Sequence, residues 1–330
     1  KKIKKSFRTL IKPFSNNKFS KDEFTNITSK VISNSTLGLR KFGLFLSGGI
    51  DSSLIAYELN KHIDDLNTFT NKVEPNVIIN GEDHNSDADI AKKFASSLGF
   101  NHKEVKITPE IIVEEWDKAN WTIEEPRYNW NLPMYYFTNK FLNKNNIIVT
   151  MSGDIGDEIL GGYQKYINMK KMKNKPKTWR DFLKIWSKKF FAPIKLNIKF
   201  NQNDLVDILE KILPEEIWNP EDIANSAMAL DCITTVSEDF FSRNDRYGMA
   251  FSMEGRFPLA SKDYMQYCLS INSDYKFGSG DNETKFPVRT SYQDKIPNYI
   301  FDKNKTGWSI PITSWLQTSN IVKNKYLETV

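Results

Sequence analysis

The heptad Ser47-Gly48-Gly49-Ile50-Asp51-Ser52-Ser53 decides the fold that this sequence predicts. It follows the apolar run 42–46, which is typical of a buried strand, and it leads into LIAYELNKHI (54–63), whose apolar residues recur with the period of a helix. The two glycines therefore lie on a turn from strand to helix. Such a turn combines unpaired backbone N–H groups with the positive end of the helix dipole, and both favour a bound phosphate or pyrophosphate.

The polar side chains of the heptad add to this anion-binding character. Ser47, Ser52 and Ser53 offer hydroxyl donors, and the adjacent glycines let the backbone approach the anion closely. Asp51 would repel phosphate unless it binds a cation, so its presence indicates Mg²⁺ between the protein and a nucleotide. An ordinary glycine turn with an Asp or Ser helix cap is the alternative. The sequence has no GxxxxGK followed by Ser or Thr, and no GxGxxG after a strand.

Outward from the heptad, strands and helices alternate along the chain. The pattern predicts further strands over 76–80, 104–107 and 147–151, and a helix over 88–99. The last of these strands ends in a second glycine-rich turn, SGDIGDEILGG (152–162). Alternating strands and helices predict an α/β fold with a parallel sheet covered by helices on both faces. Ligands of such sheets bind outside the carboxyl ends of the strands, where both glycine-rich turns are expected to lie.

The sequence also suggests a domain organisation. Residues 1–20 are basic, contain Pro13 and are interpreted as a connector. The nucleotide-binding α/β core is expected over 21–166, beginning with a helix over 21–32. Residues 167–330 have long stretches with helical spacing, so we expect this half to be mainly helical.

Length and composition exclude several classes of protein. A chain of 330 residues with 39% hydrophobic and 26% charged residues can bury a sizeable core and is not compositionally disordered. Cys232 and Cys268 form no CxxC pair, which argues against a redox or zinc motif. This cysteine usage fits a reducing compartment, so we expect the cytoplasm. The net charge of +5 is spread along the chain and does not predict nucleic-acid binding. No window approaches the roughly 18 apolar residues of a membrane span.

The two glycine-rich turns carry a resemblance to a known family. The heptad resembles the PP-loop of the ATP pyrophosphatase superfamily, whose members cleave ATP between the α and β phosphates. Ser152–Tyr163, SGDIGDEILGGY, is similar to the SGDGGDELFGGY signature of the asparagine synthetase family. Asp245–Pro258 is similar to the family's DRMSMAHSLEVRVPFLD block, and Lys305-Thr306-Gly307-Trp308 to its KxGF block.

This resemblance implies an adenine nucleotide alpha hydrolase-like fold, ATP and Mg²⁺ as cofactors, and roles for particular residues. The implied Mg²⁺ ligands are Asp51 and Asp157. The implied catalytic residues are Lys305, which would stabilise developing charge, Asp154, at a position linked to acyl-adenylate chemistry, and Glu125, which would orient the nucleophile. The candidates for binding ATP and pyrophosphate are Ser47, Gly48, Gly49, Asp51, Ser52, Ser53 and Gly153. Substrate-binding candidates are Arg246, Glu254 and Arg256, for which a buried ion-pair scaffold is an equal alternative.

The chain departs from the family pattern near the expected acceptor pocket. Pro258-Leu259-Ala260-Ser261 stands where the family has PFLD, so a carboxylate is lost. Glu124-Glu125-Pro126 resembles an acidic-Pro segment that is one residue short before Pro133, and Ile155 replaces a small residue. A pocket built to hydrogen-bond one group tolerates the loss of that pairing poorly. The resemblance therefore leaves L-aspartate open as the substrate.

The implied reaction is amide formation. A carboxylate attacks the α-phosphate of ATP to give an acyl-adenylate and pyrophosphate, and ammonia or an amine then expels AMP. Aspartate, a sugar acid, a peptide side chain and a β-lactam precursor all remain open as the carboxylate.

One alternative function is that of a PP-loop enzyme that modifies tRNA, but the sequence shows neither reactive cysteines beside the loops nor a concentrated basic face. A non-enzymatic interaction module is the other, and retention of Asp51, Asp157 and Lys305 disfavours it.

The nitrogen source follows from the position of the heptad. Glutamine-using relatives carry an N-terminal glutaminase domain, and here the heptad begins within about fifty residues of the start, which leaves no room for one. We therefore expect free ammonia, an amine on the substrate itself, or ammonia from a separate glutaminase chain or a missing N-terminal segment. No nucleic-acid or membrane partner is expected, and a homodimer stays open.

Overall fold

The computed structural model describes residues 17–38, 41–79, 82–125, 127, 129–188, 201–278, 284–302 and 309–329. The chain folds into two compact units, each built from separate stretches of sequence. We call residues 28–154, 239–258 and 292–330 the sheet unit, and residues 1–27, 155–238 and 259–291 the helical unit. The domain boundaries expected at residues 20 and 166 stay a prediction.

The sheet unit holds the strands and most of the helices around them. Its strands are β1 (Phe42–Phe45), β2 (Asn67–Val73), β3 (Ile78–Ile79), β4 (Glu82–Asp83), β5 (Asn101–Ile107), β6 (Val149–Met151) and β7 (Glu254–Arg256). Its helices are α3 (Ile50–Leu59), α4 (Ser86–Ser97), α5 (Pro109–Ile123), α6 (Leu132–Lys144), α12 (Ser242–Met249), α15 (Asn298–Phe301), α16 (Ile312–Thr318) and α17 (Asn320–Thr329).

The helical unit consists of helices and short turns. Its helices are α7 (Gly156–Leu160), α8 (Gln164–Lys170), α9 (Trp179–Ser187), α10 (Gln202–Ile212), α11 (Ile223–Asp231) and α13 (Lys262–Ser270). Three further helical segments run across a boundary between the units: α2 (Lys21–Asn34), a π-helix (Cys232–Phe241) and α14 (Phe286–Tyr292). Short 3₁₀ turns lie at Glu215–Ile217, Pro258–Ala260 and Ser273–Tyr275.

Five parallel strands form the main sheet, in the order β5-β2-β1-β6-β7. In the register of the central strand, Leu44 lies opposite Thr68 of β2 and Met151 of β6. The parallel α/β fold expected from the sequence is confirmed. Because β1 and β6 are neighbours that run in the same direction, the turns that follow them leave the same edge of the sheet.

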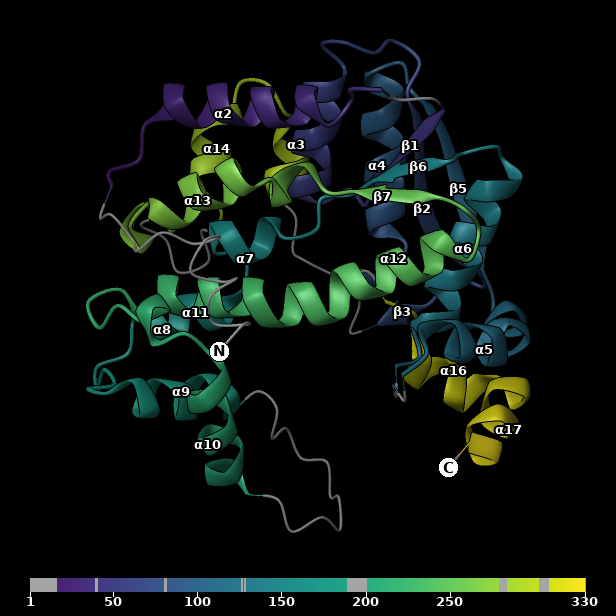
Figure 1. The fold of residues 1–330 in the computed structure, drawn as a ribbon. Coiled ribbons are helices and arrows are strands. Elements are labelled where there is room, and N and C mark those ends of the chain that lie inside the picture. Colours follow the sequence, from purple (N-terminus) through teal and green to yellow (C-terminus); the bar gives the residue numbers. More distant parts are fainter. Residues whose placement is uncertain are drawn as a thin grey trace. The chain divides into compact units, whose positions relative to one another are not determined.

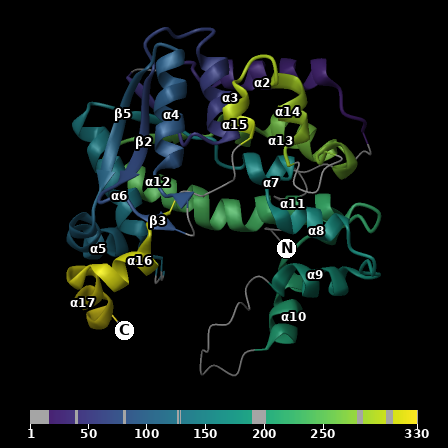
Figure 2. The ribbon, with the colours of Figure 1, turned by 180° about the vertical axis from the view of Figure 1, so that it is seen from behind.

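Helices cover both faces of this sheet. The connections β1-α3-β2 and β2-α4-β5 move in one direction across the sheet, and the return from β5 through α5 and α6 to β6 moves in the other. Right-handed crossovers therefore put α3 and α4 on one face and α6 on the opposite face. Figures 1 and 2 show this arrangement from the two sides. On the α6 face, Phe69 of β2 packs against Phe141 of α6, with ring centroids 6.5 Å apart.

The second strand of the sheet lies elsewhere than the sequence pattern predicts. Of the strand expected over 76–80, the described residues form only the short β3, which pairs with β4 in an antiparallel ladder and is not part of the main sheet. The main sheet instead contains β2, over Asn67–Val73, and residue 80 lies outside the described residues. Thr68 and Thr70 of β2 are buried, so this strand contributes β-branched polar side chains, not an uninterrupted apolar run, to the buried part of the sheet. β2 ends where the Asn85 side chain accepts a hydrogen bond from the Val73 N–H at 2.8 Å and donates one to the Val73 carbonyl at 2.9 Å.

One buried carboxylate ties three helices of the helical unit together. Asp231, at the end of α11, is 1% exposed and accepts hydrogen bonds from the Tyr166 hydroxyl at 2.6 Å and the Trp186 indole N–H at 2.9 Å. The Lys165 ammonium lies 2.5 Å from the same carboxylate. Tyr166 and Lys165 belong to α8 and Trp186 to α9, so Asp231 fixes these two helices against α11. In the part of the chain that the structure describes, no helix is long and apolar enough to cross a membrane.

Candidate functional site

The first glycine-rich turn joins β1 to α3 in the sheet unit, as the sequence predicts. Gly48 has a positive φ of 76°, and Gly49 stands before the first turn of α3 without a side chain that caps it. The Ser47 N–H donates to the Ser52 hydroxyl at 3.2 Å, and that hydroxyl donates to the Gly49 carbonyl at 3.1 Å. Ser52 thus braces the turn internally, and Ser53 is fully buried. Contacts of either hydroxyl with a phosphate stay a prediction.

The structure explains the two adjacent glycines, Gly48 and Gly49, in different ways. A Cβ at Gly48 would lie 2.5 Å from the Asp87 carbonyl oxygen and 3.3 Å from the Ala91 nitrogen, both in α4. Gly48 is therefore needed because the turn approaches the backbone of α4, in addition to its positive φ. A Cβ at Gly49 would meet only the Ser47 hydroxyl, at 3.4 Å. Gly49 is thus the glycine at which the turn stays open.

This difference predicts unequal effects of two neighbouring substitutions. Gly48→Ala is expected to lower the free energy of unfolding by about 2–4 kcal/mol, since it adds backbone strain and an overlap with Asp87. Gly49→Ala, the matched control, is expected to change it by less than about 1 kcal/mol. Urea denaturation of both variants measures the difference. Equal losses would show that the contact with α4 does not decide the residue at position 48.

The second glycine-rich turn packs directly on the first. A Cβ at Gly153, two residues after β6, would lie 2.9 Å from the Asp51 Cβ and 2.9 Å from the Ser52 nitrogen. Glycine is therefore required where the two turns meet. The uncapped N-terminus of α3 beside this contact leaves backbone N–H groups without helical partners, and such a helix end fits an anion. The residues present thus fit the phosphates of a nucleotide.

Asp154, the next residue, receives two hydrogen bonds on one oxygen. Its Oδ2 accepts from the Ser152 hydroxyl at 2.9 Å and from the Asn244 amide at 2.9 Å. The same Asn244 amide nitrogen donates to the Phe240 carbonyl at 2.9 Å. Rotating the amide by 180° would point its oxygen at two acceptors, so this orientation is fixed by its partners. These two donors therefore fix the orientation of the Asp154 carboxyl group.

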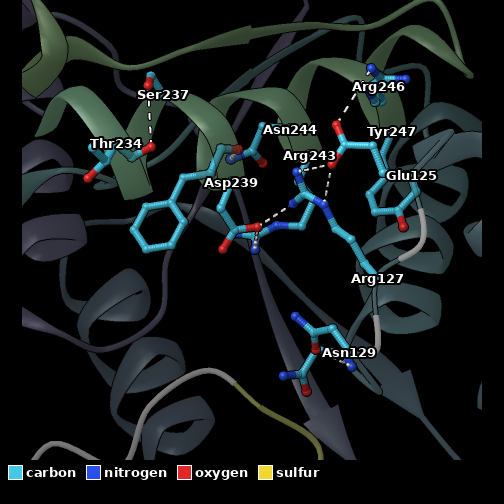
Figure 3. A network of polar contacts seen from close by, with 12 residues as sticks. Glu125, Arg127, Asn129, Thr234, Ser237, Asp239, Arg243, Asn244, Arg246 and Tyr247 are labelled. Atoms are coloured by element: carbon cyan, nitrogen blue, oxygen red, sulfur yellow. Dashed lines mark hydrogen bonds and ion pairs between the residues drawn. The ribbon is translucent and has the colours of Figure 1, made fainter. Parts of the chain in front are cut away.

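A network of charged side chains joins α12 and Asp239 to the segment between α5 and α6 (Figure 3). Arg127 pairs with Glu125 at 2.8 Å and with Asp239 at 2.5 Å. Arg243 of α12 reaches the same Asp239 oxygen at 3.4 Å. Arg246 pairs with Glu124 and lies 3.8 Å from Glu125. Glu125 is thus one member of a charged network whose arginines Arg127 and Arg243 were not identified from the sequence.

Tyr135 of α6 connects this network to Asp154. The Arg243 guanidinium carbon lies 4.2 Å from the centroid of the Tyr135 ring. Burial raises the pKa of Tyr135, the charge of Arg243 opposes this rise, and the carboxylates of Asp154 and Asp239 add to it. The hydrogen bond from Asn244, the residue after Arg243, brings Asp154 to the same helix, α12.

Of the three proposed substrate-binding residues, Glu254 and Arg256 pair with each other, and Arg246 lies in a different set of contacts. Arg256 of β7 pairs with Glu254 at 2.8 Å and donates to the Ser35 and Leu37 carbonyls at 2.9 and 3.0 Å. These bonds tie the edge strand to the segment after α2. Arg246 has other partners, the glutamates after α5. A substrate role for Arg246, Glu254 and Arg256 stays a prediction.

In the helical unit, Asp157 lies in the first turn of α7 and forms an ion pair with a lysine. Its Oδ1 lies 2.6 Å from the Lys285 ammonium, and both side chains are largely buried. A Cβ at Gly162 would lie 1.8 Å from that oxygen, so glycine is needed for the pair to form. Burial and the adjacent Asp157 raise the pKa of Glu158 to about 7. Lys285, which was not among the predicted site residues, is thus a direct partner of a predicted Mg²⁺ ligand.

The predicted Mg²⁺ site uses residues of both units, Asp51 of the sheet unit and Asp157 of the helical unit. Within the described ranges, no three His, Cys, Asp or Glu side chains form a group that could hold a metal ion. Mg²⁺ commonly binds through one or two carboxylates together with substrate phosphates, so such a group is not required. Joint ligation by the two aspartates stays a prediction. Lys305 and Pro126 lie outside the described residues.

Comparisons with known proteins show the family to which this chain belongs. A family model described as asparagine synthase matches residues 30–329. Asparagine synthetase 1 (glutamine-hydrolyzing) of Bacillus subtilis is 25% identical over 309 residues, which cover 83% of this chain and 47% of the relative. A putative asparagine synthetase (glutamine-hydrolyzing) of Mycobacterium tuberculosis H37Rv is 23% identical over 339 residues, which cover 92% of this chain and 50% of the relative. The chain spans about half the length of the curated relatives it matches. Because the family model covers nearly all of its residues, the chain belongs to the asparagine synthase family.

Proposed function

We propose that this chain is an ATP-dependent, amide-forming synthetase that activates a carboxylate as an acyl-adenylate and then transfers the acyl group to ammonia or an amine. The observation that carries the proposal is the contact of Gly153 with Asp51 and Ser52. It joins the family's second signature turn to an uncapped helix N-terminus that fits phosphates, beside the central strand of a parallel sheet.

In this proposal the turn after β1 holds the phosphates. The backbone N–H groups at the start of α3 would bind the phosphate oxygens on which negative charge grows as pyrophosphate leaves. Gly49 leaves the turn accessible, and the bonds between Ser47 and Ser52 keep its shape. Asp51 and Asp157 are each proposed as Mg²⁺ ligands. The bound ion would neutralise phosphate charge.

Asp154 and Glu125 are proposed to act on the acceptor side of the reaction. Asp154, oriented by Ser152 and Asn244, can attract a cationic ammonium or accept a proton from the attacking nitrogen. Glu125 is about two-fifths exposed and is oriented by Arg127, so it can orient an incoming nucleophile only from that paired position.

A sulfur-transferring, tRNA-modifying function has less support. Both cysteines are buried in the helical unit, and burial raises the pKa of Cys268 to about 12 and that of Cys232 well above its usual value. The thiolate is the reactive form of cysteine, so neither thiol is prepared to carry sulfur. Amide formation needs no thiol in the synthetase site.

The test is product formation by the purified chain. ATP, Mg²⁺ and ammonium chloride are supplied with L-aspartate, L-glutamate, succinate or β-alanine, and AMP, pyrophosphate and amide are measured. We expect at least one acid to stimulate AMP and pyrophosphate formation in equal amounts. Magnesium-dependent ATP binding in calorimetry without turnover on any acid would favour the non-enzymatic alternative.

Lys305 is the proposed stabiliser of charge on the departing phosphates. Lys305→Ala is expected to slow turnover by at least about two orders of magnitude, as loss of one preorganised charge does, while the affinity for ATP changes much less. Turnover rates and calorimetric ATP affinities separate these effects. Equal losses in both quantities would make Lys305 a ground-state phosphate contact instead.

A further inference from the structure

Arg243 has hydrogen-bonding capacity that the described residues do not use. It is 7% exposed, and its Nε–H has no hydrogen-bond partner in the described part of the chain. A guanidinium carries five N–H donors, and a buried donor without an acceptor is costly. This donor is therefore a place where a ligand acceptor would be favourable.

The positive charge of Arg243 is also only weakly compensated. Asp239 lies 2.5 Å from Arg127 but 3.4 Å from Arg243, so the carboxylate belongs mainly to Arg127. Arg127 has Glu125 as a second carboxylate, at 2.8 Å. Among the described residues, the rings of Tyr135 at 4.2 Å and Phe240 at 5.3 Å also lie against the Arg243 guanidinium, and they hold it in place without neutralising it.

The position of Arg243 relates this cation to the reaction. Arg243 precedes Asn244, whose amide donates to Asp154, and the Arg243 guanidinium lies over the ring of Tyr135. A substrate bound near Asp154 would thus lie beside a fixed, incompletely neutralised guanidinium. Planar guanidinium groups bind carboxylates through two parallel N–H···O bonds.

We propose that Arg243 is a specificity-determining residue that binds an anionic group of the substrate other than the reacting carboxylate, so that the site prefers acids with two negative groups. Arg127 and Asp239 position its guanidinium, and Tyr135 supports it from the ring face. This inference rests on the proposed amide-forming function, which supplies the carboxylate substrate.

The test compares two acids of equal chain length. Succinate has two carboxylates and butyrate has one, and ligand-observed NMR with ATP and Mg²⁺ present measures their binding to the whole chain. We expect succinate to bind more tightly than butyrate, and Arg243→Met to weaken succinate by between about 10- and 150-fold while leaving butyrate within about twofold. Arg243→Lys keeps the charge without the planar fork, so we expect an intermediate loss.

Arg180→Met is the matched control, since it also removes one arginine but from a surface pair with Asp207 and Glu210. It is expected to leave both acids unchanged. Equal binding of succinate and butyrate to the unmodified chain, or an equal loss in Arg180→Met, would overturn the proposal. If Arg243→Met does not fold, the test uses Arg243→Lys alone. Unchanged succinate binding by Arg243→Lys would also overturn the proposal.

The turnover assay separates this inference from the function on which it rests. Acid-dependent pyrophosphate release with an unchanged Michaelis constant for the acid in Arg243→Met would remove the inference and keep the function. Arg243-dependent succinate binding without pyrophosphate release on any acid would keep the anion site and remove the amide-forming function.

Discussion

Asp51→Asn is expected to reduce acid-dependent pyrophosphate release by at least about two orders of magnitude, the usual range for losing a preorganised electrostatic contribution. The substitution keeps the shape of the side chain and removes its charge, so a metal ion and the phosphates it neutralises would lose their anionic partner. The fold should survive. Asp51 lies in the first turn of α3, where loss of a charge costs typically 0.3–1 kcal/mol.

The experiment measures pyrophosphate release over a range of Mg²⁺ concentrations, with denaturation curves for each variant. Asp64→Asn is the control, because Asp64 is an exposed aspartate of the same unit, between α3 and β2. It should release pyrophosphate like the unmodified chain. Unchanged release by Asp51→Asn at every Mg²⁺ concentration would end the assignment of Asp51 as a metal ligand.

Asp231→Ala is expected to produce the largest loss of stability, about 3–5 kcal/mol. The Tyr166 hydroxyl and the Trp186 indole N–H would stay buried without the acceptor that they share, and Lys165 would lose its carboxylate. Desolvation is the main cost, because each of the two buried donors is left without a hydrogen-bond acceptor. Lys165 is 38% exposed and adds little, since solvent screens it.

Urea denaturation of the variant measures this loss. Asp207→Ala is the comparison, since Asp207 pairs with Arg180 at 2.6 Å but is 53% exposed. A surface pair of this kind is worth roughly 0–1 kcal/mol. If both variants lost the same stability, the buried position of Asp231 would not be the reason for its effect.

The strands were predictable where one physical signal dominated. β1 and β6 are short apolar runs that end at glycine-rich turns, and both lie where the sequence predicts them. β2 was misplaced because Thr68 and Thr70 are buried through their tertiary position, which a hydrophobicity pattern does not register. β7 was not predicted at all, because Glu254–Arg256 has no apolar residue and becomes a strand only by pairing with β6.

The candidate site was predictable to the extent that its residues are contiguous. Ser47–Ser53 form the turn after β1 and the start of α3, and Asp154 lies on the turn after β6, as their motifs indicate. The reason for Gly48 could not be predicted, because the backbone that it approaches belongs to α4, about forty residues later. Arg127 and Arg243 are 116 positions apart, and their common partner Asp239 is visible only once the chain has folded. Long-range charge pairing leaves no periodic signal in the sequence.

The discontinuous make-up of the two units affects how the chain is synthesised and folded. β6 ends at residue 151, but its partner β7 begins at residue 254, after a long stretch that belongs to the helical unit. During translation the edge of β6 therefore stays unpaired until about a hundred further residues have left the ribosome. Such distant pairing slows folding, and an open strand edge favours aggregation while it lasts. We therefore expect refolding yields to depend steeply on protein concentration, and truncations that end before β7 to be recovered mainly as aggregates.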